Sequence, residues 1–344
     1  MNKTAVVILN WNGRDFLEKF LPSLLCNNSE NQADIYVADN GSTDDSVDFL
    51  KKNFPDVKVI QLSENYGFAG GYNKALAQIS DYRYFVLLNS DVELTQNWLQ
   101  PLTEYLDTHE DTAAVQPKIL SFSNKNKFEY AGAAGGFIDK WGFPFCRGRI
   151  FGTVETDNAQ YNNILDVFWA TGACLVIRAA DYWAVGGLDD DFFAHQEEID
   201  LCWRLKARGK KITCVPQSIV YHLGGGTLTS ENPKKTYLNF RNNLLLLYKN
   251  LPDNRLRKTL FVRFFFDYLA AFQFVISGKW KNAKQIFYAR RDFCKIKNRF
   301  LQKRKENLKE TVIENIPEIF PQSIVFQYYL KNKKYFQNYN YKTK

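Results

Sequence analysis

Short apolar runs alternate with amphipathic helical segments along the first part of the chain, and this alternation limits the folds open to it. The run TAVVILN at 4–10 is rich in Val and Ile and is followed by polar residues, which is typical of a buried parallel strand. The segment 14–27 then places Phe and Leu at helical spacing. The same order repeats through 33–54 and 57–79, and a further apolar run follows at 84–89. We therefore predict an α/β fold with a mostly parallel sheet flanked by helices and joined by right-handed crossovers.

Polar residues follow the predicted strands at the points where the strands end. In an open parallel sheet, ligands bind beyond the carboxyl ends of the strands. The residues found there are Asn10, Asp39, Asn65 and Asp91. We expect these four side chains to converge on one cleft.

Several classes of protein are excluded by motifs that the sequence lacks. No GxGxxG follows the first strand and no GxxxxGK[ST] occurs, which argues against a dinucleotide dehydrogenase and a P-loop NTPase. The six Cys form no CxxC pair, so neither a zinc ribbon nor a disulfide framework is indicated. The first residues hold too few apolar positions for a signal peptide, and no run of about 18 uncharged apolar residues occurs. We expect a protein that stays inside the cell and has no spanning helix.

Groups near two strand ends suggest a cation site. Asp91 follows an apolar run and has Asn89 two residues before it, so their oxygens suit a Mg²⁺ or Mn²⁺ ion bound to a diphosphate. His222 also ends an apolar run and is a candidate ligand for the same ion. The alternatives are a capping role for Asp91 and a structural role for the histidine.

Two further motifs fit a nucleotide. Asp39, in VADNGSTDD, either accepts the imide N–H of a pyrimidine base or forms an Asx-turn. Gly70 and Gly71, in YGFAGGYN, belong either to a tight turn before a helix or to a backbone that approaches a phosphate.

The stretch FFAHQEEIDLCWRLKARG at 192–209 crowds carboxylates beside aromatic residues. In a helix that begins near Glu197, Asp200 lies four residues before Arg204 and we expect the two to pair. Glu197 and Glu198 fall in the first turn, where the helix dipole favours anions. An unpaired carboxylate screened by aromatics has the environment of a general base, and local spacing does not choose between the two Glu.

Seven motifs occur in an order that resembles the family 2 glycosyltransferases, which have the Rossmann-like GT-A fold. They are VILNWNG, VADNGSTDDS, NYGFAGGYN, LLNSDVE, TGACLVIRA, EEIDLCWRLKARG and YHLGGGT. The resemblance covers about residues 4–245 and is greatest to the branch that includes rhamnosyl- and galactofuranosyl-transferases of bacterial surface glycans. It implies transfer of a sugar, with inversion, from a nucleotide-sugar to an acceptor hydroxyl.

The resemblance assigns roles on the donor side of the site. Asp39 corresponds to the base-recognising Asp, Asn89 and Asp91 to the DxD motif, and His222 to the His that completes metal coordination. Asn89 replaces the first Asp of DxD and removes one charge. The nucleotide-sugar site that we predict comprises Asn10, Asp39, Asn65, Gly70, Gly71, Asn89 and Asp91, with Asp91 and His222 on the metal.

On the acceptor side, the resemblance makes Glu198 the catalytic base, with Glu197 as the alternative. The family more often has Asp at the position of Glu198. Acceptor contacts in the family lie near the turn that corresponds to Thr171 and Gly172, although this run could also be plain core.

Charge divides the chain into a predicted catalytic domain at 1–250 and a helical, basic region at 251–344. The second region carries 21 Lys and Arg against 7 Asp and Glu, whereas the first carries 24 against 30. A wide apolar stripe runs from 256 to 276 with basic residues on both sides. We expect it to lie in the interface of an anionic membrane, at the inner face of the cell membrane, or to pack on the catalytic domain or a second copy of the chain.

The leading hypothesis is an inverting, metal-dependent glycosyltransferase that uses a UDP- or dTDP-linked sugar and a saccharide acceptor, free or polyprenyl-linked, in polysaccharide synthesis. One alternative is a sugar-nucleotide-binding or scaffold subunit without turnover. Another is a nucleotidyltransferase, which would release pyrophosphate. The basic tail lacks a nucleic-acid-binding motif, so we expect no nucleic-acid partner; a homo-oligomer is left open.

Overall fold

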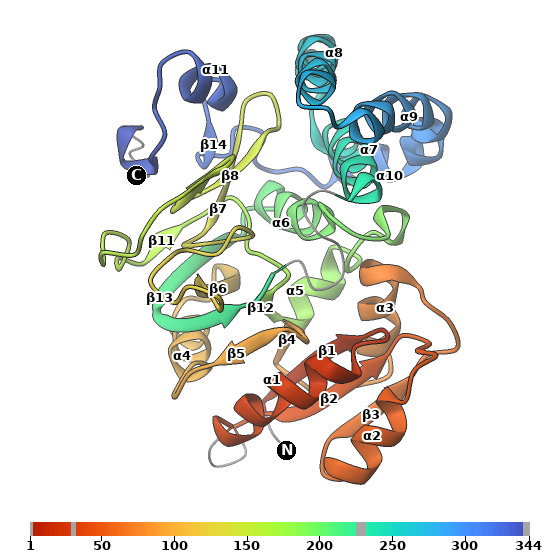
Figure 1. Ribbon diagram of the computed structural model, residues 1–344, viewed down its shortest axis with the longest axis vertical. Helices are drawn as coiled ribbons and strands as arrows, with labels where there is room; N and C mark the ends of the chain where they lie inside the picture. The colour runs from red at the N-terminus through yellow and green to blue at the C-terminus, as the bar shows by residue number, and fades with distance from the viewer. Residues whose placement is uncertain (1–2, 29–31, 225–231, 340–344) are drawn as a thin grey trace.

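A large central sheet carries helices on both faces in the computed structural model of the protein, which describes residues 3–28, 32–224 and 232–339 (Figure 1). Nine strands from these ranges form the sheet. They are β1 (Thr4–Asn10), β2 (Asp34–Asp39), β3 (Lys58–Gln61), β4 (Tyr84–Asn89), β5 (Val92–Leu94), β6 (Thr112–Ser121), β11 (Leu165–Asp166), β12 (Cys174–Arg178) and β13 (Lys211–His222).

The order of the strands is β11-β13-β6-β12-β4-β1-β2-β3, and β5 pairs with β13. β3, β2, β1 and β4 are parallel neighbours, as the alternation in the sequence predicts. β12 runs antiparallel to both β4 and β6, and β5 and β11 run antiparallel to β13. The α/β class is confirmed. The parallel pairing that we predicted is concentrated in β1 to β4, and the complete sheet is mixed.

Three helices before β4 and one between β5 and β6 supply the first covering layers. They are α1 (Arg14–Cys26), α2 (Ser46–Asn53), α3 (Gly67–Leu76) and α4 (Gln100–Thr108). β1 is apolar at successive positions because both of its faces are covered: Val6 belongs to the core under α1, α2 and α4, and Val7 to the core under α3.

Two helices extend the α3 side of the sheet, α5 (Ala179–Ala184) and α6 (Glu197–Ala207), with the short 3₁₀ turn η2 (Asp190–Phe192) between them. A smaller sheet, in the order β10-β9-β8-β7-β14, packs on the same core. Its strands are β7 (Gly136–Asp139), β8 (Pro144–Cys146), β9 (Arg149–Ile150), β10 (Thr153–Val154) and β14 (Ile319–Phe320).

The C-terminal part of the chain is mainly helical. Its helices are α7 (Pro233–Asn250), α8 (Asp253–Ile276), α9 (Trp280–Ile296), α10 (Leu301–Lys309) and α11 (Ile324–Tyr329), with the 3₁₀ turns η3 (Lys297–Phe300) and η4 (Phe336–Asn338). Figure 1 shows α7 to α10 grouped together, on the far side of α6 from β1 to β3. The chain then returns to the small sheet, where β14 pairs with β7 and the Tyr328 hydroxyl lies 2.8 Å from the Thr153 hydroxyl. The boundary at residue 250 stays a prediction.

Helix α8 buries its polar side and exposes its apolar side. Arg263 and Asp267 are 2% and 0% exposed and bond to each other. The exposed residues are Phe261, Phe264, Phe265, Leu269, Phe272 and Ile276, with exposed fractions between 46% and 71%. Within the described residues α8 alone has the length and apolar content to cross a membrane, whereas the sequence analysis expected no such helix. Its polarity is the reverse of that of a helix packed on a water-soluble core.

Candidate functional site

One cavity of about 2450 Å³ extends from the strand ends of the large sheet to α8 and α11. The predicted site residues on its wall are Asn65, Asn89, Asp91, Thr171, Gly172, Glu197, Glu198 and His222. Four predicted residues are not part of the wall: Asn10, Asp39, Gly70 and Gly71. Of the four strand-end residues that we expected to converge on one cleft, Asn65 and Asp91 line this cavity, whereas Asn10 and Asp39 do not.

Asp39 and Asn10 form a buried polar pair just beneath this wall. Asn10 Nδ2 donates to Asp39 Oδ1 at 3.1 Å, and the Ser42 backbone N–H donates to Asp39 Oδ2 at 3.0 Å. The second bond reaches the backbone three residues on, one residue farther than an Asx-turn, and gives Asp39 a local structural role. Asn10 Oδ1 is buried with no hydrogen-bond partner within the described residues, and Gly13 leaves the space beside it open, since a Cβ there would lie 2.5 Å away.

Gly70 and Gly71 lie inside helix α3, so the reading as a tight turn before a helix was wrong, and the reading as a phosphate contact stays a prediction. A Cβ on Gly71 would lie 2.8 Å from Leu9 Cδ1, so Gly71 lets the helix pack on β1. The turn is made instead by Gly67, whose φ of +72° favours glycine. Asn65 Oδ1 accepts the Gly67 N–H at 2.8 Å, and Gly67 is on the cavity wall.

Asp91 and His222 are in direct contact at the ends of β4 and β13. His222 Nε2 lies 3.0 Å from Asp91 Oδ1 and 3.4 Å from Asn89 Nδ2, while Nδ1 lies 3.5 Å from Glu129 Oε2. Burial lowers the pKa of His222, but the two carboxylates outweigh it and raise the pKa to about 10. Gly225 to Thr227 of the YHLGGGT motif lie outside the described residues.

The fit of these residues to a divalent ion is partial. Across the described ranges, no group of three or more His, Cys, Asp and Glu side chains is arranged to hold a metal. Asp91 and His222 Nε2 nevertheless point at each other, whereas Glu129 faces the opposite ring nitrogen. A Mg²⁺ or Mn²⁺ ion often binds one or two carboxylates and takes its other ligands from substrate phosphates and water. Asp91 and His222 would suit such an ion.

Glu197 and Glu198 begin helix α6, as predicted, and each has a buried Oε2 without a hydrogen-bond partner in the described part of the chain. Burial raises the pKa of Glu198 to about 7 against the pull of backbone N–H groups. Burial and the charge of Glu198 raise the pKa of Glu197 well above its usual range. A carboxyl with the pKa of Glu198 can exchange a proton with an acceptor near neutral pH.

The loop before Glu197 is held in an unusual backbone conformation. Phe193, His195 and Gln196 all have positive φ, at 63°, 70° and 75°. Asn242 of α7 stabilises the loop, because its Nδ2 donates to the carbonyls of Phe192, Ala194 and His195 at 2.8 to 2.9 Å. Strain of this kind is common at functional sites.

The sequence model of "Glycosyl transferase family 2" matches residues 5–173, which carry β1 to β4 and the strand-end polar residues. This part of the chain belongs to glycosyl transferase family 2. The matched range contains Asp39, Asn89 and Asp91, whereas Glu198 and His222 follow it.

A curated relative of this glycosyltransferase is "N-acetylglucosaminyl-diphospho-decaprenol L-rhamnosyltransferase" of Mycobacterium tuberculosis. It is 25% identical over 234 residues, which cover 63% of this chain and 75% of the relative.

Two solved structures share the GT-A fold with this chain. Staphylococcus aureus TarS 1-349, in complex with UDP-GlcNAc, has a TM-score of 0.56 at 15% identity and covers 90% of this chain and 89% of its own. GalNAc-T7 with UDP, GalNAc and Mn²⁺ has a TM-score of 0.57 at 16% identity, over 74% of this chain and 49% of its own. At these identities the likeness concerns the fold.

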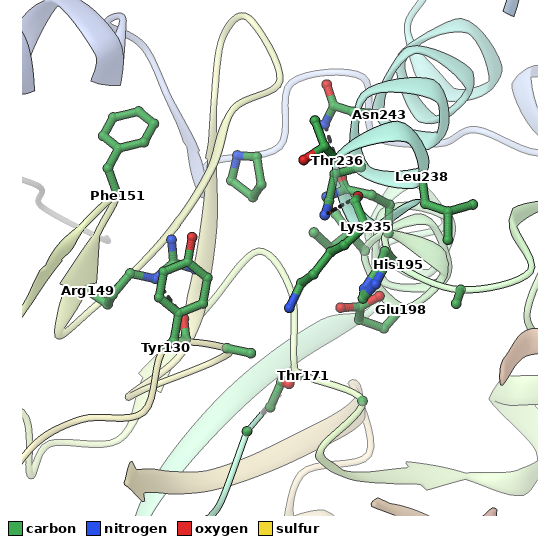
Figure 2. A pocket seen from close by; sticks show the side chains of 18 of the residues that line it. Tyr130, Arg149, Phe151, Thr171, His195, Glu198, Lys235, Thr236, Leu238 and Asn243 are labelled. Atoms are coloured by element: carbon green, nitrogen blue, oxygen red, sulfur yellow. Dashed lines mark hydrogen bonds between the residues drawn. The ribbon is translucent and has the colours of Figure 1, made fainter. Parts of the chain in front are cut away.

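The glycosyltransferase site includes residues that sequence reasoning missed. Figure 2 shows Tyr130 and Arg149 on one side of the cavity, Glu198 and His195 on the other, and Lys235 reaching between them, with Thr171 nearby. Burial and the charge of Lys235 lower the pKa of His195 to about 4, so this imidazole is neutral. No periodicity or motif marks Arg149 or Glu129, because they lie in the segment 129–149, which is rich in Gly and aromatic residues and contains none of the seven motifs of the resemblance.

Thr171 is buried, and its position is fixed by the backbone. Its N–H donates to Gln116 Oε1 at 3.0 Å and its Oγ1 accepts the Ala173 N–H at 3.2 Å. Gly172 packs beside Phe68, where a Cβ would lie 2.9 Å from the ring. Both residues line the cavity, but their acceptor role stays a prediction.

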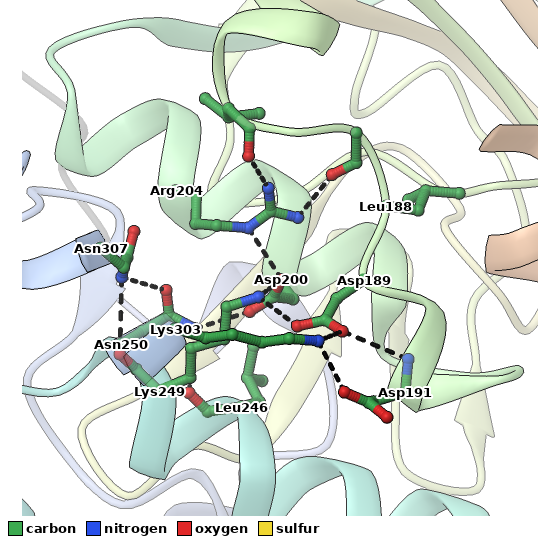
Figure 3. Close-up of polar contacts among 12 residues, drawn as sticks. Leu188, Asp189, Asp191, Asp200, Arg204, Leu246, Lys249, Asn250, Lys303 and Asn307 are labelled. Carbon is green, nitrogen blue, oxygen red and sulfur yellow. Dashed lines mark hydrogen bonds and ion pairs between the residues drawn. The ribbon is translucent and has the colours of Figure 1, made fainter. Parts of the chain in front are cut away.

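Asp200 belongs to a separate, fully paired charge cluster (Figure 3). Arg204 Nε lies 2.8 Å from Asp200 Oδ2, which confirms the predicted pair. Lys249 Nζ lies 2.8 Å from the same oxygen and 2.6 Å from Asp189 Oδ2, and Asn250 Nδ2 donates to Asp200 Oδ1 at 2.8 Å. Burial would raise the pKa of Asp200, but the cations of Lys249 and Arg204 hold it below its usual range.

Proposed function

We propose that the protein is an inverting, metal-dependent glycosyltransferase that moves a sugar from a UDP- or dTDP-linked donor to a hydroxyl of a saccharide acceptor. The observation that carries the proposal is the buried Glu198 Oε2, which has no hydrogen-bond partner among the described residues, in the cavity that Asn89, Asp91 and His222 also line. A single displacement needs a base on one side of the anomeric carbon and charge compensation for the leaving diphosphate on the other.

Glu198 is the proposed base. Its pKa of about 7 leaves a sizeable deprotonated fraction at neutral pH and keeps the carboxylate basic enough to take a hydroxyl proton. In the reaction, the acceptor oxygen bonds to the anomeric carbon, its proton passes to Glu198, and the bond from that carbon to the diphosphate oxygen breaks. Glu197 is the alternative base, but it is only 4% exposed.

Asp91 and His222 are the proposed ligands of a divalent cation. A bound Mg²⁺ or Mn²⁺ would offset the negative charge that grows on the leaving diphosphate. Asn89 supplies an amide in place of a carboxylate, so the protein's own ligands carry one charge fewer than an Asp-x-Asp pair. Support also comes from GalNAc-T7, which was crystallised with Mn²⁺.

Asn10, Asp39, Asn65 and the start of α3 are the proposed nucleotide side. Asn10 Oδ1 has no hydrogen-bond partner among the described residues, whereas both oxygens of Asp39 already accept hydrogen bonds. We therefore expect the nucleotide to be contacted either after a local rearrangement of these two side chains or by the loop atoms above them. Gly70 and Gly71 are now assigned to helix packing, so any phosphate contact from this motif would come from Gly67 or Phe68 on the cavity wall.

The acceptor is proposed to be lipid-linked, for synthesis of a cell-surface polysaccharide at an anionic membrane surface. The apolar outer side of α8 and the basic balance of the C-terminal region support this location. The name of the Mycobacterium tuberculosis relative also describes a decaprenol-linked acceptor. Association with the inner face of the membrane, and assembly into an oligomer, stay predictions.

Calorimetric titration with UDP, dTDP and GDP, each with and without Mn²⁺, tests the donor side. We expect a pyrimidine diphosphate to bind only with Mn²⁺ and this binding to be lost in Asp91→Ala. Absence of binding to every nucleotide would contradict the proposal and favour a scaffold without turnover. Release of pyrophosphate in place of a nucleoside diphosphate would favour a nucleotidyltransferase.

A further inference from the structure

Arg149 is a buried cation without a carboxylate partner. Its side chain is on the cavity wall and the residue is 8% exposed. Nε donates to the Tyr130 carbonyl at 2.7 Å, Nη2 lies 3.6 Å from Cys146 Sγ, and the guanidinium carbon stacks 4.1 Å from the centre of the Tyr130 ring. In the described ranges no acidic side chain forms an ion pair with it, and the charge of Glu129 acts on it only from beyond ion-pair distance. A buried guanidinium normally has an anion beside it.

A comparison with Arg263 shows that the lack of an ion-pair partner is particular to Arg149 and is not general to buried arginines on this cavity wall. Arg263 is buried to a similar degree and lines the same cavity, but it is paired with Asp267 and donates to Asn243. Lys235 adds a second positive charge opposite Arg149 (Figure 2). Burial lowers the pKa of Lys235, the charge of Glu129 raises it, and the charge of Arg149 lowers it by a smaller amount, so the two cations are close enough to interact. Two cations facing one space favour an anionic ligand.

Beyond Arg149 the cavity becomes apolar. Phe151 and Val154 follow it along the small sheet and also line the cavity. The far wall is formed by α8 and α11 and includes Leu269, Phe272, Ile276, Val325, Phe326 and Leu330. Several of these residues are exposed on the side of α8 that carries the phenylalanines. The cavity therefore passes from carboxylates, to cations, to a hydrocarbon-like wall that ends at an apolar surface.

We propose that Arg149, stacked on Tyr130 and helped by Lys235, binds an anionic phosphate group of the acceptor, and that the acceptor's hydrocarbon chain lies between α8 and α11. This inference rests on the proposed function, because it places the acceptor sugar beside Glu198. It adds a specificity residue on β9 and a path by which an amphiphile enters from a membrane. Guanidinium and phosphate match in geometry as well as in charge.

Binding of farnesyl phosphate, farnesol and inorganic phosphate to the full chain in EDTA tests the proposal by calorimetry. Without a divalent cation, the proposed donor site contributes little to phosphate binding. We expect farnesyl phosphate to bind at least about tenfold more tightly than farnesol or inorganic phosphate, since a charge-assisted bond and apolar burial both contribute. Equal affinities for farnesyl phosphate and farnesol would overturn the anion site.

Two variants divide the site into its parts. Arg149→Gln should weaken farnesyl phosphate about tenfold or more and leave farnesol unchanged. Leu269→Glu, on an exposed position, should weaken farnesyl phosphate and farnesol and leave inorganic phosphate unchanged. Arg149→Lys keeps the charge and serves if the Gln variant fails to fold, with an intermediate affinity expected. Lys127→Gln, an exposed cation on the cavity edge, is the matched control and should change nothing.

The same variants separate this inference from the donor proposal. Arg149→Gln should bind UDP and dTDP with Mn²⁺ as the parent does. If it weakens the nucleotides and farnesyl phosphate alike, Arg149 belongs to the donor site and the inference is wrong. If no nucleotide binds any variant but farnesyl phosphate behaves as expected, the donor proposal fails and the amphiphile site stands.

Discussion

The first four residues of α6 hold two kinds of buried carboxylate. Asp200 is 0% exposed and contacts Arg204, Lys249 and Asn250, so both of its carboxylate oxygens accept hydrogen bonds. Glu197 and Glu198, three and two residues before Asp200, each have a buried Oε2 with no hydrogen-bond partner among the described residues. One carboxylate has its pKa lowered and the other two have theirs raised.

The difference shows how a carboxylate with a structural role can be distinguished from one with a catalytic role in the same charged segment. A buried charge with a complete set of partners holds elements together, and removal of one partner is costly because the other is left uncompensated. A buried carboxyl without partners lowers stability unless a substrate uses it, so its presence points to function. Proximity in sequence does not distinguish the two, but the partners do.

Glu198→Gln is expected to have the largest effect. Loss of the base should lower kcat by about 10²- to 10⁴-fold while the variant keeps its fold and its nucleotide affinity. Initial rates with a nucleotide-sugar donor, together with calorimetry, would measure this. Glu197→Gln is the matched control: if it, and not Glu198→Gln, abolishes transfer, the base has been assigned to the wrong residue.

Lys249→Met tests the paired carboxylates, because Lys249 contacts both Asp189 and Asp200. It leaves Asp189 and Asp200 buried without their shared cation and should lower the free energy of unfolding by about 3 to 5 kcal/mol. Denaturant unfolding would check this. Lys303→Met is the control, because Lys303 is 39% exposed and should cost only about 1 kcal/mol or less. Equal costs for the two variants would mean that burial does not decide the effect.

The pH dependence of rate and of stability should run in opposite directions. The deprotonated form of Glu198 is the base, so kcat should rise with pH through about 7. Its folded pKa lies above the ordinary value of 4.5, so the folded state binds the proton more tightly and stability falls as pH rises from 4.5 to 7. Glu198→Gln should lack this fall and gain roughly 1 kcal/mol over the parent at pH 8, after allowance for solvent in the cavity. A parent that is equally stable at both ends of this range would count against the raised pKa.

Helix α8 extends the comparison to apolar groups. Arg263 and Asp267 are paired inside, whereas its phenylalanines are exposed outside and contact mainly one another, so Phe265→Glu should leave the free energy of unfolding within about 0.5 kcal/mol of the parent. The same change should weaken binding to vesicles with anionic lipid by about tenfold, as measured by sedimentation. Lys305→Gln on α10 makes the same change in net charge and is the control. If both variants bind equally well, α8 does not contact the membrane.

Much of the fold could be predicted because its signals are local. The apolar runs of β1 and β4 and the helical spacing between them indicate the strand-helix order, and the spacing of Asp200 and Arg204 predicts their pair. The antiparallel β12 could not be foreseen, since an apolar run carries no direction. Gly70 and Gly71 were misplaced because a glycine pair reads as a turn even where it provides close helix packing.

The site was only partly predictable for a related reason. Asp91, Glu198 and His222 lie at strand or helix boundaries. At such a boundary the change from apolar to polar residues is visible in the sequence. Glu129 and Arg149 lie among short strands and turns without periodicity, and their roles arise from contacts with segments far along the chain. Lys249 likewise meets Asp200 across 49 residues, which no local pattern records.

The carbonyl of Phe193 joins the two halves of the site. It accepts the N–H groups of Phe68 and Ala69 at the start of α3, at 2.6 and 3.4 Å, and it lies in the strained loop that leads into Glu198. Gly67 allows this contact, since a Cβ there would lie 2.5 Å from the Phe193 ring. A shift of α3 when the nucleotide enters would therefore be passed to the base through one peptide group. In kinetic terms, such a coupling would make arrival of the proposed donor and readiness to deprotonate the acceptor a single event, and would guard the activated sugar against premature loss to water.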